Sequence, residues 1–215
     1  MCSIISGFNK DRVKELAKLN SYRGQHSHSV FVYDTSTTNI LYQYKDFGPL
    51  DLDSHDLPDG YIICHQQAPT TDNKNTTSIH PARLDYNLLY HNGIIKSQEI
   101  RRLSASMNCP DITWDTMLIL KQLIDTGSPN NIDGTFSCIW HTESELYVFR
   151  NEISPLFFDC ITIDGKPDIV LSSTKFDGGA SLEPNIIFKL NLLECSLESV
   201  STFTTKENPY FLNNT

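Results

Sequence analysis

Residues 1–8 read MCSIISGF, a short run of small and apolar side chains that predicts a β-strand from Cys2 to Phe8. Methionine aminopeptidases tolerate small second residues such as cysteine, so we expect Met1 to be removed. Cys2 would then carry a thiol beside a free α-amine, whose ordinary pKa of about 8 suits it to act as a base. The cysteine is therefore either a small strand residue or a nucleophile with its own base.

Length and composition indicate one domain spanning residues 1–215. The chain has 39% hydrophobic and 20% charged residues and a mean hydropathy of -0.30, which are ordinary values for a soluble globular protein. A net charge of -9 argues against a nucleic-acid-binding surface, which needs a basic face. The sequence shows no run of about 20 apolar residues that would span a membrane and no secretory signal. We therefore expect a cytoplasmic protein without nucleic-acid or membrane partners.

The six cysteines are scattered along the chain without a CxxC pair. In a chain without a secretory signal, this spacing predicts reduced thiols and not a disulfide framework, and it does not fit a zinc site. The aspartates between Asp51 and Asp59 form an acidic loop that lacks the spacing and the glycine of an EF-hand. We expect neither a metal ion nor an organic cofactor.

Apolar spacing predicts a helix over 11–20 with Asn9 as its N-cap, and two more helices over 97–106 and 114–126. Alternating β-branched and aromatic residues predict strands elsewhere, at 29–34, 40–46, 60–68 and 87–95 and in most of the chain after residue 134. The Asn92-Gly93 pair predicts a turn at the end of one strand, and Asp164-Gly165 predicts a hairpin turn. Strand blocks on both sides of two helices indicate a layered α+β fold and not alternating βαβ units.

Further motifs follow in an order that a nucleophilic cysteine would need. Arg23-Gly24 follows the first helix, His91-Asn92-Gly93 ends a strand, and Asp115 opens a helix. The later segments DGTFSCIWHTESELYVFRNEISPLFF (133–158) and LSSTKF (171–176) continue the series. In this order and spacing the chain resembles the class II (N-terminal nucleophile, Ntn) glutamine amidotransferase domains, which occur in glucosamine-phosphate synthase, amidophosphoribosyltransferase and asparagine synthetase. The resemblance covers nearly the whole chain and implies a single-domain, four-layer αββα sandwich.

The resemblance also implies roles for individual residues. Cys2 would be the nucleophile, and Asn92 and Gly93 would form the oxyanion hole through the side-chain amide and a backbone N–H. Asp115 would bind the α-ammonium group of glutamine, and Arg23 matches the Arg-Gly segment beside the nucleophile. The alternatives are a strand residue, an Asn-Gly hairpin turn, a first-turn helix acid and a surface arginine, respectively.

One segment departs from the family pattern. Where the family commonly has Gly-His-x-Arg ahead of a threonine, residues 64–70 read CHQQAPT, so Gln67 replaces the arginine that would hold the α-carboxylate. A charge-assisted pair contributes roughly 1.5–3 kcal/mol and a neutral hydrogen bond about 1 kcal/mol, so glutamine would bind about tenfold more weakly. His65, Gln67 and Thr70 remain candidate substrate-binding residues.

The expected activity is hydrolysis of the glutamine side-chain amide through a γ-glutamyl thioester at Cys2, which releases glutamate and ammonia. We expect a separate synthase partner that accepts the ammonia. Gln67 favours one alternative, an Ntn amidase that acts on a different amide. The other alternative is a catalytically silent binding or regulatory subunit that keeps the scaffold.

Overall fold

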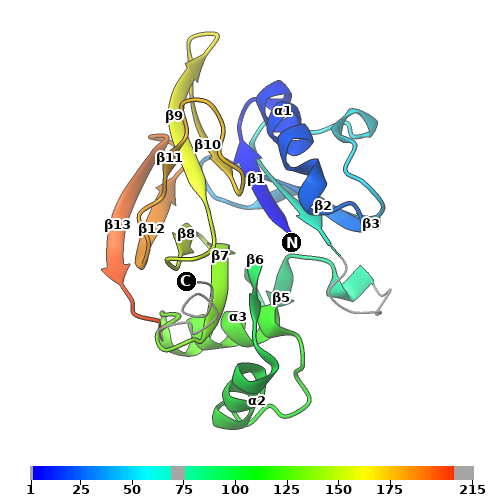
Figure 1. Ribbon diagram of the computed structural model, residues 1–215. Helices are drawn as coiled ribbons and strands as arrows, with labels where there is room; N and C mark the ends of the chain where they lie inside the picture. Colours follow the sequence, from blue (N-terminus) through cyan, green and yellow to red (C-terminus); the bar gives the residue numbers. More distant parts are fainter. Residues whose placement is uncertain (1, 69–75, 206–215) are drawn as a thin grey trace, which may run out of the picture.

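Two antiparallel β-sheets form the centre of the molecule (Figure 1). The computed structural model describes residues 2–68 and 76–205. Within them the first sheet has seven strands, in the order β11 (Ala180–Ser181), β9 (Phe157–Ile163), β10 (Lys166–Ser172), β1 (Ser3–Gly7), β4 (Tyr61–Gln67), β2 (Ser27–Tyr33) and β3 (Ile40–Phe47). The second sheet has six, in the order β13 (Ser196–Thr202), β12 (Ile186–Asn191), β8 (Leu146–Arg150), β7 (Gly134–His141), β6 (Asn87–Ile95) and β5 (Ala82–Leu84).

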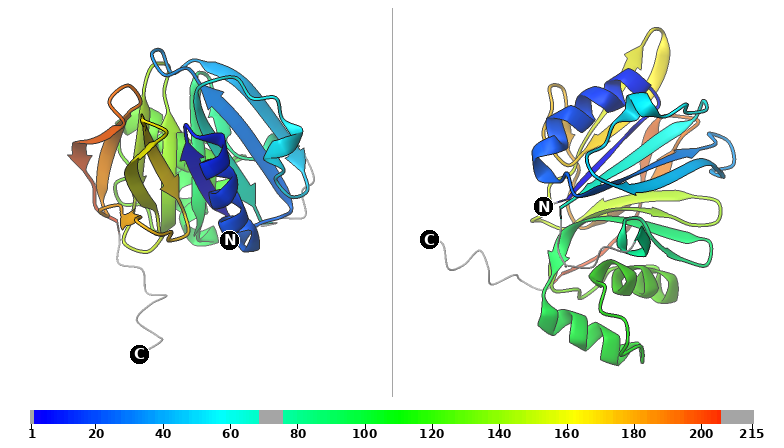
Figure 2. Two further views of the ribbon diagram at one scale, coloured as in Figure 1. Left: turned by 90° about the horizontal axis from the view of Figure 1, so that it is seen from above. Right: turned by 90° about the vertical axis from the view of Figure 1, so that its right-hand side faces the viewer.

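Helices cover the outer faces of the two sheets. Helix α1 (Lys10–Asn20) lies against the first sheet, while α2 (Ser97–Ser106) and α3 (Asp115–Thr126) lie beyond the second sheet (Figure 2). Short 3-10 turns are formed by Ser21–Arg23, Leu52–Ser54 and Thr76–Ser78. The expected α+β class is therefore confirmed, with strands before and after the α2–α3 pair in the chain.

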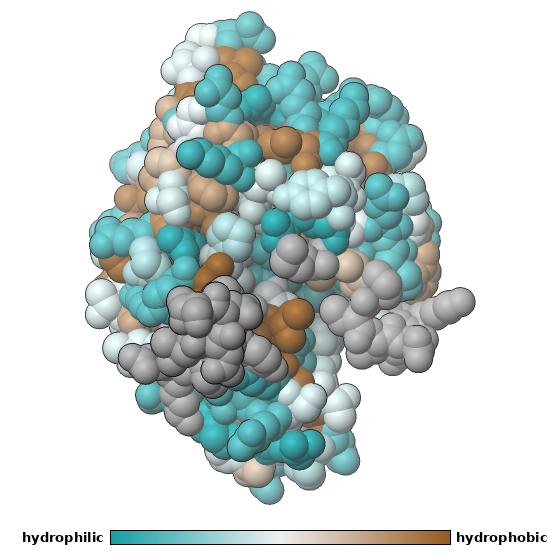
Figure 3. Space-filling view, in the orientation of Figure 1, coloured by the Kyte–Doolittle hydropathy of each residue, from teal (hydrophilic) through white to brown (hydrophobic). Residues whose placement is uncertain are grey.

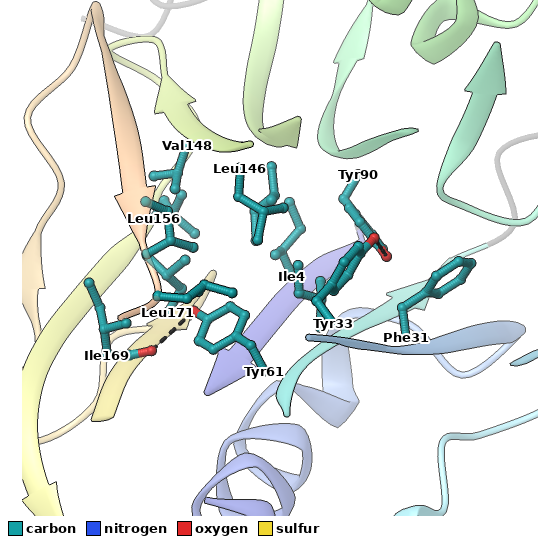
Figure 4. Packing of buried hydrophobic residues seen from close by; sticks show 14 of the residues in the cluster. Ile4, Phe31, Tyr33, Tyr61, Tyr90, Leu146, Val148, Leu156, Ile169 and Leu171 are labelled. Atoms are coloured by element: carbon teal, nitrogen blue, oxygen red, sulfur yellow. Dashed lines mark hydrogen bonds between the residues drawn. The ribbon is translucent and has the colours of Figure 1, made fainter. Parts of the chain in front are cut away.

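Alternation along the strands explains how the sheets pack. Side chains at every second position face the partner sheet, as with Ile4 of β1, and the intervening ones face a helix, as with Ile5. Between the sheets, the Tyr33 hydroxyl of β2 lies 2.9 Å from the Tyr90 hydroxyl of β6, so a hydrogen bond joins the two sheets inside an apolar core. Figure 4 shows this pair and the nearby Tyr61 hydroxyl, which donates to the Ile169 carbonyl at 3.0 Å.

The turn between β1 and α1 is held by one buried carboxylate. Asp168 of β10 accepts the N–H of Phe8 at 2.8 Å and that of Asn9 at 3.0 Å. The Asn9 side chain in turn accepts the Arg12 N–H at 2.8 Å and so caps α1, as its sequence position predicts. Because β1 also pairs with β4 and β10 on its two sides, the strand that follows Cys2 is fixed in the middle of its sheet.

Most sequence expectations for local structure hold, and one was wrong. The helix over 97–106 is confirmed, and Asp164 and Gly165 both have positive φ (51° and 76°) in the expected hairpin turn. Asn92 and Gly93 do not form a turn, because β6 continues through them and pairs them with Ser137 and Phe136 of β7. Strands β12 and β13 lie in the region after residue 134 where strands were expected, but their pairing as a hairpin was not predicted.

The face of the molecule drawn in Figure 3 is largely hydrophilic. On the face shown in Figure 3, hydrophobic residues form small separate patches among hydrophilic ones. Among the described residues, no helix combines the length and the apolar character that crossing a membrane requires. The six cysteines are all unpaired, and Cys160 is the exposed one among them.

Candidate active site

Cys2 lies directly before β1 and is almost completely buried, with 6% of its surface exposed. Its carbonyl accepts a hydrogen bond from Arg23 Nε at 3.0 Å, so the arginine of the 3-10 turn after α1 anchors the backbone at this point. Arg23 is itself buried. The structure thus brings together the two residues that the sequence separates by the whole of β1 and α1.

The Cys2 thiol is surrounded by groups that act on its ionisation. Burial raises the pKa of Cys2 above its ordinary value, while a hydrogen bond from the Ala68 backbone N–H lowers it. The Asp115 carboxylate raises the same pKa, and the Arg23 guanidinium lowers it. Cys2 is therefore a protonated thiol at neutral pH, and it needs a base to become a nucleophile.

Asn92 is connected to the cysteine strand through Ser173. The Asn92 side-chain amide donates to the hydroxyls of Ser137 and Ser173, each at 3.3 Å. The Ser173 hydroxyl also accepts the backbone N–H of Ile4 at 2.9 Å, and the Ser173 N–H donates to the Ile4 carbonyl at 3.0 Å. Ser173 therefore links β1 of the first sheet to β6 of the second sheet next to Cys2.

Gly93 is required by close packing and not by backbone conformation. A Cβ atom at this position would lie 1.8 Å from the Thr135 carbonyl oxygen and 2.7 Å from His91 Nε2. No side chain larger than hydrogen fits there without displacing β7. The glycine thus lets the backbone beside Asn92 lie close to the neighbouring strand.

Asp115 is the first residue of α3 and is half-buried. Its carboxylate accepts the Ile95 N–H at 3.2 Å and the Thr116 N–H at 2.8 Å. It therefore stabilises the N-terminus of its own helix, where a negative charge is favourable. It also acts on Cys2, so both interpretations of this residue are compatible with its position.

Gln67 is buried at the end of β4, and both ends of its amide are used by the protein. Its Nε2 donates to the Ser78 carbonyl at 3.2 Å, and its Oε1 lies 3.0 Å from His80 Nδ1 and 3.3 Å from His80 N. His65, two residues earlier, is fully buried with its Nε2 2.9 Å from the His91 carbonyl. Thr70 and Met1 lie outside the described residues.

Four residues that sequence reasoning missed belong to this region: Ser137, Ser173, His80 and Thr116. Ser173 lies in the LSSTKF segment, which the resemblance includes without a role for the serine. His80 and Thr116 lack a recognisable motif of their own, although Thr116 directly follows Asp115. Within residues 2–68 and 76–205, no group of three or more His, Cys, Asp or Glu side chains is arranged to hold a metal ion.

The fold resembles that of several solved structures. Glutamine phosphoribosylpyrophosphate amidotransferase from B. subtilis aligns with a TM-score of 0.68 and 16% identity, over 94% of this chain and 49% of that chain. A structure described as the allosteric regulatory enzyme of purine biosynthesis gives a TM-score of 0.67 and 18% identity over the same shares, 94% and 49%. A glutamine aminotransferase class-II domain protein from Silicibacter pomeroyi gives 0.52 and 12% identity, over 94% of this chain and 100% of that chain.

This is the fold of the class II glutamine amidotransferases.

The likeness to this amidotransferase fold is structural. No protein-family model and no curated protein sequence matches the chain. The chain also spans only about half the length of the first two structures, 49% of each. The two sheets and their helices therefore identify the fold, and the chemistry that the protein can perform depends on the residues around Cys2.

Proposed function

We propose that this protein is a glutaminase of the class II amidotransferase type, in which Cys2 attacks the side-chain amide of glutamine. The observation that carries the proposal is the link through Ser173, which connects Asn92 to Ile4 in β1, the strand that directly follows Cys2. One hydroxyl thus connects the side-chain amide donor to the strand that follows the proposed nucleophile. In this interpretation α1, the two sheets and the α2–α3 pair correspond to the four layers of an αββα sandwich.

The chemistry needs a base, because burial keeps the Cys2 thiol protonated. After removal of Met1, the α-amine of Cys2 takes the thiol proton, and the sulfur attacks the amide carbon. The oxygen becomes an oxyanion that accepts hydrogen bonds from the Asn92 amide and the Gly93 N–H. Because both Asn92 contacts to serine are long, at 3.3 Å, the oxyanion replaces one of them at little cost.

Collapse of this intermediate expels ammonia, which takes the proton held by the α-amine, and leaves a γ-glutamyl thioester on Cys2. Water then attacks the thioester with the amine as base, which gives glutamate and regenerates the thiol. Asp115 pairs with the α-ammonium group of glutamine, and Arg23 supports the nucleophile through the Cys2 carbonyl. No step calls for a metal ion or an organic cofactor.

The α-carboxylate of glutamine is the weak point of substrate binding. Gln67 donates to Ser78 and accepts from His80, so its amide is already engaged by the protein. We propose that His65 and Gln67 support this end of the site and that Thr70 contributes a neutral donor. A different amide substrate is the second candidate, favoured by Gln67 in place of an arginine. A panel of amides decides between them by which one is turned over.

The central experiment combines an activity assay with intact mass. A diazoketone analogue of glutamine should label the protein once, on a chain that has lost Met1, and Cys2→Ala should abolish both labelling and ammonia release. Cys160→Ala is the matched control, because Cys160 is exposed and lies on β9 away from Cys2. Labelling that persists in Cys2→Ala, or an unlabelled wild type without turnover, contradicts the proposal. The latter result would favour a silent regulatory subunit.

The ammonia that this reaction releases has to be consumed by an acceptor. We propose that the cytoplasmic partner of this protein is a synthase that aminates an electrophilic substrate. Co-purification of the full chain at its natural level would test this. A monomer that turns over glutamine fully without any associated synthase would count against the partner and leave the glutaminase proposal intact.

A further inference from the structure

Three buried histidines from different elements meet beneath the candidate site: His65 of β4, His80 before β5 and His91 of β6. The rings of His65 and His80 stack with their centroids 4.2 Å apart. Thr116, in the first turn of α3, is completely buried and contacts two of the three histidines. Its hydroxyl lies 2.8 Å from His80 Nε2 and 3.0 Å from His91 Nδ1. One hydroxyl therefore has two imidazole partners.

The direction of these hydrogen bonds is set by Gln67. Its nitrogen faces the Ser78 carbonyl and its oxygen faces two nitrogens of His80, one of which is a backbone N–H. The opposite orientation would set the amide oxygen against a carbonyl and its NH₂ group against that N–H. Gln67 Oε1 therefore accepts from His80 Nδ1. A neutral His80 with its proton on Nδ1 has an acceptor at Nε2, and the Thr116 hydroxyl donates to it.

His91 completes the chain. Because the Thr116 proton is given to His80, the Thr116 oxygen accepts from His91 Nδ1. Every donor then points the same way, from His91 to Thr116, to His80, to Gln67 and to the Ser78 carbonyl. Hydrogen bonds aligned in this manner polarise and strengthen one another.

The nearby charges agree with this direction. Asp115 Oδ1 is the competing acceptor for the Thr116 proton, but it lies 3.3 Å away against 2.8 Å for His80. If Thr116 donated to Asp115, His80 would have to carry protons on both nitrogens. Burial, with smaller contributions from His65, His91 and Lys45, lowers the pKa of His80 well below its ordinary value, which excludes that state at neutral pH.

The chain ends at the segment that carries Asn92 and Gly93. With its one proton on Nδ1, the His91 ring has no donor at Nε2, so the longer 3.3 Å approach of Nε2 to the Thr135 carbonyl is a packing contact and not a hydrogen bond. This contact lies in the space that a Cβ on Gly93 would enter. The His91 carbonyl is held from the other side by His65 Nε2 at 2.9 Å. The residue opposite His91 on β7 is the buried Cys138, so β7 places no charged side chain opposite His91.

We propose that Thr116 is a positioning residue, whose hydroxyl fixes the His91 ring and thereby the Asn92–Gly93 segment, and couples it to Gln67 at the end of β4. The inference rests on the proposed glutaminase function, because it assigns Asn92 and Gly93 to the oxyanion. Thr116 itself is not assigned a contact with the substrate.

Two substitutions test the role in catalysis. Thr116→Val keeps the shape of the side chain and removes the hydroxyl, so kcat for glutamine hydrolysis should fall about 10- to 100-fold, the range of a lost oxyanion-hole donor or somewhat less, with KM changed less than about threefold. Thr116→Ser restores the hydroxyl and should restore kcat to within about threefold. Thr126→Val, at the far end of the same helix, is the matched control. Unchanged kcat in Thr116→Val, or no rescue by serine, overturns the proposal.

Nitrogen-15 spectra of the histidine side chains give a readout that does not depend on activity. In the wild type, His80 should carry its proton on Nδ1 and His65 on Nε2, and Thr116→Val should move the His80 and His91 signals but not that of His65. A wild-type His80 protonated on Nε2 overturns the network, whether or not any variant folds. A wild type without glutaminase activity but with the expected tautomers refutes the proposed function and leaves the hydrogen-bond chain standing.

Discussion

The Asn92 side-chain amide donates to the Ser173 hydroxyl at 3.3 Å, and the same hydroxyl accepts the N–H of the strand that follows Cys2. Ser173 directly follows β10 of the first sheet, and Asn92 lies in β6 of the second sheet, 81 residues away in the chain. The distance between nucleophile and amide donor is therefore set where the two sheets meet.

Replacing Ser173 by alanine should separate these two elements. Ser173→Ala removes the acceptor of the Ile4 N–H, which is buried, so we expect the free energy of unfolding to fall by about 1–3 kcal/mol. Glutamine turnover should fall about tenfold or more, since the amide loses a partner that orients it. Chemical denaturation and an ammonia assay measure the two effects. Ser199→Ala on the exposed edge strand β13 is the control, and equal behaviour of both variants would refute the role of Ser173.

Gly93→Ala should be more damaging than an ordinary glycine substitution. The added Cβ would lie 1.8 Å from a backbone carbonyl, so β7 has to shift and the Asn92 amide shifts with it. Gly127→Ala is the comparison, because Gly127 has φ of 70° but no atom within 4 Å of its added Cβ, and such a substitution costs about 1 kcal/mol. We expect Gly93→Ala to lose at least twice that stability and most glutaminase activity. A milder effect at Gly93 would show that the strand yields easily.

Asp115→Asn should separate substrate binding from nucleophile ionisation. The substitution removes the charge proposed to pair with the substrate ammonium, so KM for glutamine should rise about 10- to 100-fold, equivalent to the roughly 1.5–3 kcal/mol of a charge-assisted contact. Because the Asp115 charge raises the pKa of Cys2, the pH midpoint of Cys2 alkylation should move to a lower value. A KM equal to that of the wild type would leave Asp115 with its helix-capping contacts alone.

The buried histidines should make the protein sensitive to acid. Burial lowers the pKa of His65 to about 3 and that of His80 well below its ordinary value, whereas both titrate near 6.5 in the unfolded chain. The unfolded state therefore binds more protons below that pH. Stability is fully present above about pH 6.5 and declines as pH falls toward 3, by up to about 1.4 kcal/mol per pH unit for each histidine.

Denaturation over a pH series measures this decline. His80→Asn keeps a side-chain N–H for Gln67 and removes one titrating group, so its stability should fall less steeply with acid. Identical slopes in the variant and the wild type would show that His80 is not responsible.

The sequence identified the fold through motifs that are local in the chain, and it failed where contacts are not local. Cys2, Arg23 and Asp115 could be proposed because each lies at a recognisable boundary, namely a chain start, a helix end and a helix start. Asn92-Gly93 was taken for a turn, since the dipeptide favours one, but pairing with β7 keeps it inside a strand. Ser173 and Thr116 were not predicted because their roles come from partners 81 and 25 residues away.

The position of β1 in the middle of its sheet has a consequence for the order of events during synthesis. Strand β10, one of its two neighbours, leaves the ribosome long after Cys2 does, and Cys2 is buried in the folded protein. An aminopeptidase needs an accessible, extended end to its substrate. We therefore expect the first residue to be trimmed from the nascent chain, before the sheet closes. A protein refolded with its methionine still attached should stay inactive even when the enzyme that removes it is added afterwards.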